Sequence, residues 1–230
     1  MTIVAFGGGG FVSTPDSPLN RYVISLARRS ERPRVCYVPT AGGDSLPHVA
    51  AFYRTCSSLG CEGTDLPLFN RTGEDVREKL LAQEVIWVGG GNTANLLAVW
   101  RLHGVDAAMR EAWEAGVVLA GSSAGMICWF EASITDSFGP QLAPLSDGLG
   151  FLPGSACPHY DGEERRRPVC REAVATGLPG GYAADDHAAL RFDGVELAEC
   201  VADREGSSVW RVALEDGQVV ERALPTRVLV

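Results

Sequence analysis

The sequence predicts a mixed α/β protein with a doubly wound, mostly parallel sheet, flanking helices and antiparallel hairpins near the carboxyl end. Over the first 130 residues, short apolar runs alternate with helical segments. Each run is continuously apolar, which is typical of strands covered by helices on both faces. The last forty residues instead place Asp-Gly turns between strand-like segments, which is typical of hairpins. A length of 230 residues fits one α/β domain over residues 1–230, although two small domains would also fit.

The expected elements follow from the order of these runs. The parallel strands are expected at residues 2–6, 35–38, 65–69, 85–88 and 117–120. The helices are expected at residues 18–29, 48–59, 72–83, 93–103, 105–115 and 126–130. Ser17 before Pro18 is a preferred N-cap with proline in the first turn, and Thr72 with Asp75 resembles a capping box. Two hairpins, at residues 190–197 and 209–223, are expected at the edge of the same domain.

Composition excludes several classes of partner. The chain has 20 basic and 29 acidic residues, a net charge of −9 and a pI near 4.9, which argues against a broad nucleic-acid-binding surface. No apolar run approaches the ~20 residues of a membrane helix, and the first residues lack a signal-type pattern. We therefore expect a soluble cytoplasmic protein, monomer or homodimer, that binds neither nucleic acid nor membranes.

The cysteines are odd in number and scattered, without a CxxC pair or a Cys/His cluster at metal-binding spacing. They occupy positions 36, 56, 61, 128, 157, 170 and 200. We expect reduced thiols packed as small apolar side chains, with no disulfide framework and no bound metal.

The segment Gly121–Gly125 has the pattern G-x-S-x-G between an expected strand at 117–120 and a helical stretch at 126–130. In this setting the pattern forms a strained turn that lifts the central serine, here Ser123, above the carboxyl edge of the sheet. The following amide, that of Ala124, would lie where a developing oxyanion is stabilised. The alternative interpretation is a Gly/Ser-rich turn that matches the pattern by chance.

A serine nucleophile needs a base, and a histidine base needs a carboxylate to orient it. His159 lies downstream of Ser123, and the carboxylate could be Asp136 or come from the pair Asp185-Asp186. The three other histidines fit less well. His187 is a rival base, whereas His48 and His103 are interpreted as packing or helix-end residues.

Two glycine clusters follow expected strands. Gly89-Gly90-Gly91 precedes a helix at the carboxyl end of a strand, where ligands bind in doubly wound sheets, and lets backbone N–H groups approach a reacting group. Gly7–Gly10 has the same location after the first strand. It lacks the Lys-Ser/Thr of a phosphate loop and the third glycine of a dinucleotide fingerprint, so we assign it to the floor of the cleft.

The ordered set Val88–Thr93, Gly121–Gly125 and Pro158-His159-Tyr160 resembles the serine peptidase family of aspartyl dipeptidase (peptidase E) and cyanophycinase. The resemblance extends from the first strand to about Leu190. It implies a fold similar to class I glutamine amidotransferases, with serine where those enzymes carry cysteine. It also implies Ser123 as nucleophile, His159 as base and the Gly91 and Ala124 amides as the oxyanion hole. We expect no cofactor, because a serine-histidine mechanism needs none.

The resemblance also bears on the third catalytic residue. Family members place a carboxylate in a segment similar to residues 181–186, commonly glutamate where this chain has Asp186. Another family assignment places it where Asp136 stands. We favour Asp186, and because aspartate is one methylene shorter, the histidine must come nearer or a water must bridge.

Substrate selection centres on Arg165-Arg166-Arg167, because a guanidinium fork suits a carboxylate. In the dipeptidases of the family, an arginine in this neighbourhood is expected to recognise an N-terminal aspartate. We add Gly90 and Asn92 to Arg165 and Arg166 as substrate-binding candidates. The alternative interpretation of the arginine run is the solvated, charged start of a helix.

The predicted function is therefore a serine exopeptidase acting on short peptides, with a preference for N-terminal aspartate and a Ser-His-Asp acyl-enzyme mechanism. One alternative is an amidotransferase-like enzyme that uses Cys128. Another is a binding protein on the same fold that has lost catalysis, since fold does not determine function.

Overall fold

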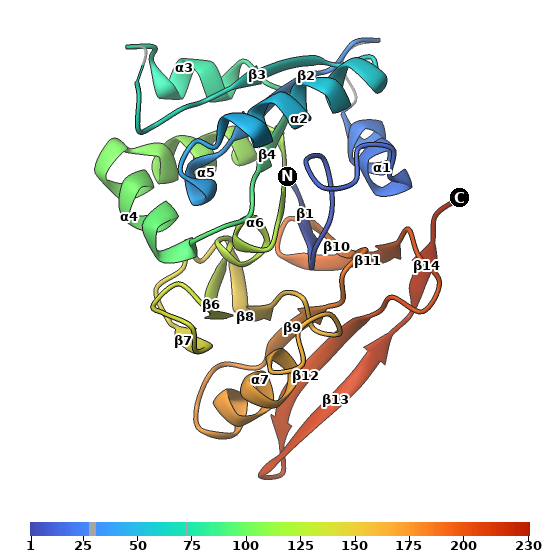
Figure 1. Cartoon of the computed structure of the whole chain (residues 1–230). Helices are drawn as coiled ribbons and strands as arrows, with labels where there is room; N and C mark the ends of the chain where they lie inside the picture. Colours follow the sequence, from blue (N-terminus) through green and yellow to red (C-terminus); the bar gives the residue numbers. More distant parts are fainter. Residues whose placement is uncertain (28–30, 72) are drawn as a thin grey trace.

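The computed structural model describes residues 1–27, 31–71 and 73–230, which form two sheets with helices packed on them (Figure 1). In these residues the first sheet has eight strands, in the order β14 (Thr226–Val228), β11 (Glu196–Ala202), β10 (Ala188–Asp193), β1 (Thr2–Phe6), β5 (Val118–Ser122), β4 (Val85–Val88), β2 (Arg34–Val38) and β3 (Glu62–Asp65). The strands from β1 to β3 in this order run parallel, whereas β10 is antiparallel to β1 and to β11.

The second sheet, in the lower half of Figure 1, continues the chain beyond the serine turn. Its six strands within the described part are β13 (Gln218–Leu224), β12 (Val209–Glu215), β9 (Gly181–Ala184), β8 (Leu152–Cys157), β6 (Phe130–Thr135) and β7 (Ala143–Leu145). Strands β6, β8 and β9 are parallel, and β7, β12 and β13 extend them in antiparallel fashion.

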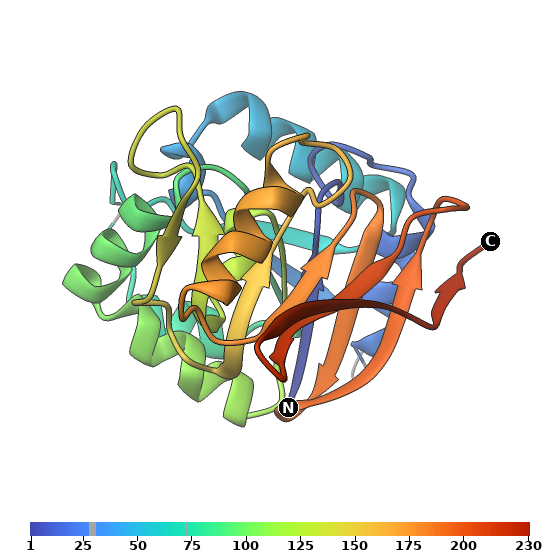
Figure 2. The same cartoon turned by 90° about the horizontal axis from the view of Figure 1, so that it is seen from below.

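Helices cover both faces of the first sheet because its strands are apolar on both sides. The helices are α1 (Pro18–Leu26), α2 (Leu46–Ser58), α3 (Val76–Leu81), α4 (Thr93–His103), α5 (Val105–Glu114), α6 (Ala124–Ile127) and α7 (Arg166–Ala175), with a 3₁₀ turn η1 at Thr40–Gly42. One core contains α1, α2 and one sheet face, and a second contains α3, α4, α5 and the other face. Helix α7, orange in Figure 2, packs on the second sheet. The predicted fold class is confirmed.

Several predicted boundaries are wrong for identifiable reasons. Strand β3 lies at Glu62–Asp65 instead of 65–69, because its register pairs Arg34 with Glu62; Leu66 and Leu68 are buried in the loop that follows. These leucines are apolar because they are buried, although their segment does not pair as a strand. The sequence pattern there therefore resembled that of a strand. The helix expected at 126–130 is the shorter α6, and Phe130 already begins β6.

The third helix begins later than predicted. Asp75 is its N-cap and accepts the Glu78 N–H, and the helix ends at Leu81. Helix α1, predicted to reach about residue 29, ends at Leu26, because Ala27 is an extended C-cap residue. The predicted cap at residue 72 and the predicted end of α1 at residues 28–29 fall outside the described residues. The second hairpin is present, but it extends the second sheet through β9, which sequence analysis did not anticipate.

All seven cysteines are buried and free in the structure, so the prediction that they pack as small apolar side chains is confirmed. In the described part of the chain, no helix is long and apolar enough to span a bilayer.

Candidate active site

Ser123 occupies a strained turn between β5 and α6, with φ 57° and ψ −110°. The flanking glycines allow this turn because the end of β4 passes directly beside it. A Cβ at Gly121 would lie 2.8 Å from the Val88 carbonyl oxygen, and one at Gly125 would lie 2.2 Å from the same atom. Strand, turn and helix therefore follow one another as the pattern predicted, and strain of this kind is concentrated at functional sites.

The triglycine after β4 lies against Ser123. A Cβ at Gly90 would stand 3.3 Å from the Ser123 Cβ. Gly91 has φ +138° and approaches η1 so closely that a Cβ would lie 2.1 Å from the Ala41 carbonyl oxygen. Within the described residues, the Gly91 and Ala124 N–H groups have no hydrogen-bond acceptor, so both can donate to a bound oxygen atom.

His159 and Asp186 form a direct pair, with 2.6 Å between His159 Nδ1 and Asp186 Oδ1. Asp186 therefore reaches the imidazole without a bridging water. The glycines of the first cluster make this approach possible, because a Cβ at Gly8 would lie 1.8 Å from Asp186 Oδ1 and 2.9 Å from His159 Nδ1. Gly162 leaves similar room, since its Cβ would lie 2.5 Å from Asp186 Oδ2. The Gly7–Gly10 segment thus accommodates the pair.

The hydrogen bond from His159 holds the pKa of the Asp186 carboxyl below its usual value, against the opposing effect of burial. Because this pKa is lowered on folding, the pair's contribution to stability is fully present above the unfolded-state value of about 3.9. It is lost only as the pH falls through the lowered pKa. Asp186 is therefore ionised at neutral pH and can orient the imidazole.

Asp136, the alternative carboxylate, is paired with Arg166 and not with His159. Its Oδ2 is 3.9 Å from Arg166 Nη2, and its side chain is 60% exposed. The structure thus places Asp186 beside the histidine and Asp136 beside the arginine.

A cavity of about 260 Å³ brings most of these residues together. It is lined by Gly91, Asn92, Ser123, Asp136, His159, Glu163 and Arg166. Within the described residues Ser123 makes no hydrogen bond to His159, although the two share this cavity; such catalytic contacts often tighten only when substrate binds.

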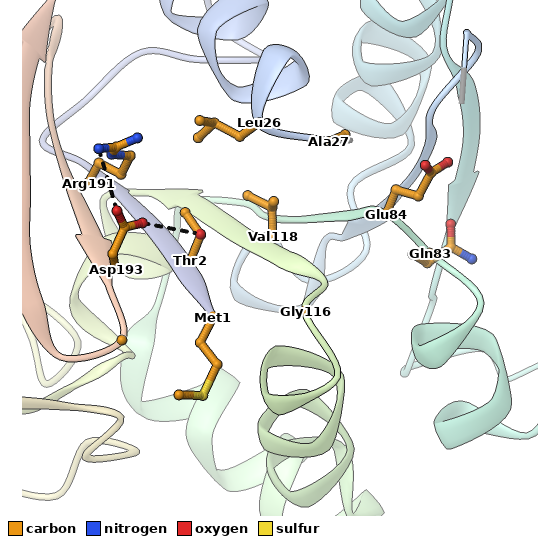
Figure 3. A pocket seen from close by; sticks show the side chains of 11 residues that line it. Met1, Thr2, Leu26, Ala27, Gln83, Glu84, Gly116, Val118, Arg191 and Asp193 are labelled. Carbon is orange, nitrogen blue, oxygen red and sulfur yellow. Dashed lines mark hydrogen bonds and ion pairs between the residues drawn. The ribbon is translucent and has the colours of Figure 1, made fainter. Parts of the chain in front are cut away.

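A larger cavity, of about 400 Å³, lies where the strands β1 and β5 begin, at the other end of these strands from Ser123 (Figure 3). Met1, Thr2 and Val118 line it at the starts of β1 and β5, together with Arg191 and Asp193. It contains neither the serine turn nor the His159–Asp186 pair, so the smaller cavity is the candidate active site.

The three arginines have different surroundings. Arg166 is 3% exposed; its Nε donates to Glu163 Oε2 at 2.6 Å and its Nη1 to the Ile134 carbonyl at 3.1 Å. Its Nη2 makes only long contacts, 3.5 Å to Glu163 Oε1 and 3.9 Å to Asp136 Oδ2. Arg165 is exposed and does not line the cavity, and Arg167 pairs with Glu221 over the Trp210 ring. Of the three arginines, Arg166 is the one that lines the cavity containing Ser123.

Asn92 and Glu163 also line the cavity. The Asn92 side-chain amide caps α4 through Asn95 N and donates to the Ser137 carbonyl at 2.9 Å, so it lines the cavity while holding its wall. Glu163 is a cavity residue that sequence analysis missed. Its spacing of three residues from Arg166, at the start of a helix, was the available signal.

The rival groups lie elsewhere. His187 pairs with Asp203, at 2.9 Å, beside a different cavity, and His103 faces Arg71. His48 also lies outside the cavity lining. Cys128 is fully buried, and burial raises the pKa of its thiol well above the usual value. A thiolate nucleophile at Cys128 is therefore inconsistent with the structure.

Comparisons with known proteins show which family the chain resembles. The model of peptidase family S51 matches residues 3–200. The uncharacterized peptidase YgaJ of Bacillus subtilis (strain 168) is 45% identical over 229 residues, covering 99% of this chain and 98% of that protein. Peptidase E of Shewanella denitrificans is 31% identical over 177 residues, covering 76% of this chain and 69% of that protein.

The crystal structure of a peptidase from an acI-B1 Actinobacterium superposes with a TM-score of 0.74 at 18% identity, covering 98% of this chain and 94% of that one. That likeness supports the fold. From the family match and the sequence relatives, the chain belongs to peptidase family S51. It is a peptidase, and thus a hydrolase that acts on peptides.

Proposed function

We propose that this chain is a serine exopeptidase of short peptides, formed as a single domain over residues 1–230, with Ser123, His159 and Asp186 as its catalytic residues. One observation carries the proposal: the strained turn at Ser123 and the His159 imidazole line the same cavity, and His159 Nδ1 is hydrogen-bonded to the Asp186 carboxylate. With Nδ1 engaged, Nε2 is the nitrogen left to accept the serine proton.

The reaction then proceeds by acyl transfer in two steps. Ser123 attacks the scissile carbonyl as His159 takes its proton, and the oxyanion is held by the Gly91 and Ala124 amides. His159 next protonates the leaving amine. Water repeats the sequence on the acyl-enzyme, and Asp186 stabilises the imidazolium that forms in each step.

The charges of the cavity support cleavage next to a free amino terminus. Asp136 and Glu163 place two negative charges in the cavity, and Arg166 places one positive charge there. The ammonium group of a substrate could therefore pair with one of these carboxylates. Arg166 Nη2, which makes only long contacts, is the donor left for a side-chain carboxylate. This pairing fits a residue that carries both charges, and so supports a preference for N-terminal aspartate.

An activated phosphonate tests the nucleophile directly. We expect one covalent adduct on the folded protein, mapped to the peptide that contains Ser123, and none after denaturation, because the strained turn and the amides exist only in the fold. An unmodified Ser123, or an adduct on another residue, would contradict the assignment.

Replacing Arg166 with lysine tests the proposed preference for N-terminal aspartate. Lysine keeps the charge but loses the fork, so we expect kcat/KM for Asp-Ala relative to Ala-Ala to fall about 10-fold. Taking the ratio cancels losses common to both substrates. The matched control is Arg165→Lys at the exposed neighbouring position, which should leave the ratio unchanged. Equal ratios in wild type and Arg166→Lys would show that Arg166 does not read the side chain.

A further inference from the structure

The Asp186 carboxylate lies on a connection between the two sheets. Strand β9 of the second sheet ends at Ala184, and β10 of the first sheet begins at Ala188. Residues 185–187 therefore cross from one sheet to the other, with Asp186 at the centre. Both neighbours of Asp186 are polar, and each is tied to a different sheet.

Asp185 is tied to the second sheet. Its Oδ1 accepts the Trp210 indole N–H at 3.1 Å, and its Oδ2 accepts the Ser208 N–H at 2.9 Å. Its own N–H donates to the Ser208 carbonyl at 3.0 Å. Asp185 is only 4% exposed, and burial raises the pKa of its carboxyl. A buried carboxylate is costly unless its oxygens are satisfied, and here both of them are.

His187 is tied to the end of β11 in the first sheet. Its Nδ1 lies 2.9 Å from Asp203 Oδ1, and its carbonyl accepts the Asp203 N–H at 3.0 Å. The Asp203 side chain is 6% exposed, and its other oxygen accepts the hydroxyl of Ser17, the N-cap of α1. His187 holds φ +67°, a conformation that is unfavourable for histidine unless its surroundings impose it.

Asp186 itself is linked to the histidine loop by its backbone. Its N–H donates to Asp161 Oδ1 at 2.8 Å, two residues beyond His159. The Asp186 backbone is thus tied to the histidine loop, and Gly8 and Gly162 leave room for its carboxylate.

We propose that Asp185, with Trp210, and His187, with Asp203, are positioning residues that hold the Asp186 carboxylate against His159 Nδ1 from two sheets. The proposal rests on the proposed catalytic role of the His159–Asp186 pair. None of these four side chains lines the cavity that contains Ser123, so they act through Asp186.

The test compares three variants of the full chain, Asp185→Asn, Asp203→Asn and Trp210→Phe. For each aspartate variant we expect kcat to fall by about 10- to 100-fold with KM within about two-fold of wild type, because misplacing a catalytic group by ~1 Å costs on the order of 100-fold. Trp210→Phe removes a single hydrogen bond to Asp185 and should lower kcat several-fold. A second readout is the downfield proton resonance of His159 Nδ1–H, assigned by its absence in His159→Gln, which should shift in all three.

The matched control is Tyr22→Phe. It removes the hydrogen bond from Tyr22 to Glu199, at 2.7 Å, which also joins α1 to β11 but does not touch residues 185–187. We expect wild-type kcat and resonance from this variant. A merely structural role would lower the melting temperature of the three variants and of the control alike, without moving the resonance.

Wild-type kcat and an unmoved resonance in folded Asp203→Asn and Trp210→Phe would overturn the proposal. If the aspartate variants fail to fold, the kcat and the His159 resonance of Trp210→Phe alone decide whether the proposal holds. The resonance does not depend on turnover. If the wild-type chain hydrolyses no peptide, the proposed function fails, whereas the resonance still reports whether the positioning residues hold the pair.

Discussion

Ser123→Ala is expected to lower kcat for peptide hydrolysis by on the order of 10⁴- to 10⁶-fold, because among the described residues that line the cavity Ser123 alone carries a hydroxyl. Alanine and serine tolerate the positive φ at this position equally, so the variant should melt at the wild-type temperature. The measurement is kcat and KM on short dipeptides, with circular dichroism to follow unfolding.

The control is Ser122→Ala, which removes a hydroxyl from the preceding residue at the end of β5. Its kcat should stay within a few-fold of wild type. Equal turnover by wild type and Ser123→Ala would show that hydrolysis does not pass through this serine, and the proposed mechanism would have to be abandoned.

The second large effect is expected from Asp186→Asn, which should lower kcat by about 10⁴-fold. An asparagine amide can present an N–H to His159 Nδ1, which favours the wrong imidazole tautomer and removes the charge that stabilises the imidazolium. Purified variants would be compared at one fixed pH, with folding checked by melting temperature.

Asp136→Asn is the matched comparison, since it makes the same change at the other candidate carboxylate. Asp136 contacts Arg166 instead of His159, so its effect should fall on KM, with kcat reduced by less than about 10-fold. A larger fall in kcat from Asp136→Asn than from Asp186→Asn, with folding intact, would reverse the assignment of the third residue.

Most of the first sheet could be predicted from sequence. Apolar runs such as Val85–Val88 become strands because they are buried on both faces, and this one ends at a run of glycines. Apart from its β12–β13 hairpin, the second sheet could not be predicted in this way. Strand β8 contains Pro153, Gly154 and Ser155, which are not typical strand residues. The residues that pair with it in β6 and β9 are more than twenty positions away along the chain, so the local pattern carried little information.

The turn around Ser123 is a local feature that the sequence by itself determined. Gly121 and Gly125 leave room for β4, and the order of strand, turn and helix follows from residues within a short window. The hairpin turns at Asp193-Gly194 and Asp216-Gly217 were determined in the same local way.

Only the tertiary structure decided which carboxylate meets His159 and which arginine lines the cavity of Ser123. Asp186 and Asp136 are 27 and 23 residues from His159 in sequence, and nothing in that spacing separates them. The choice depends on how the two sheets meet, because residues 185–187 cross between them and Gly8 leaves room for the approach. Arg166 was selected from its run in the same way, since burial of helix α7 turns one side chain inward and leaves Arg165 in solvent.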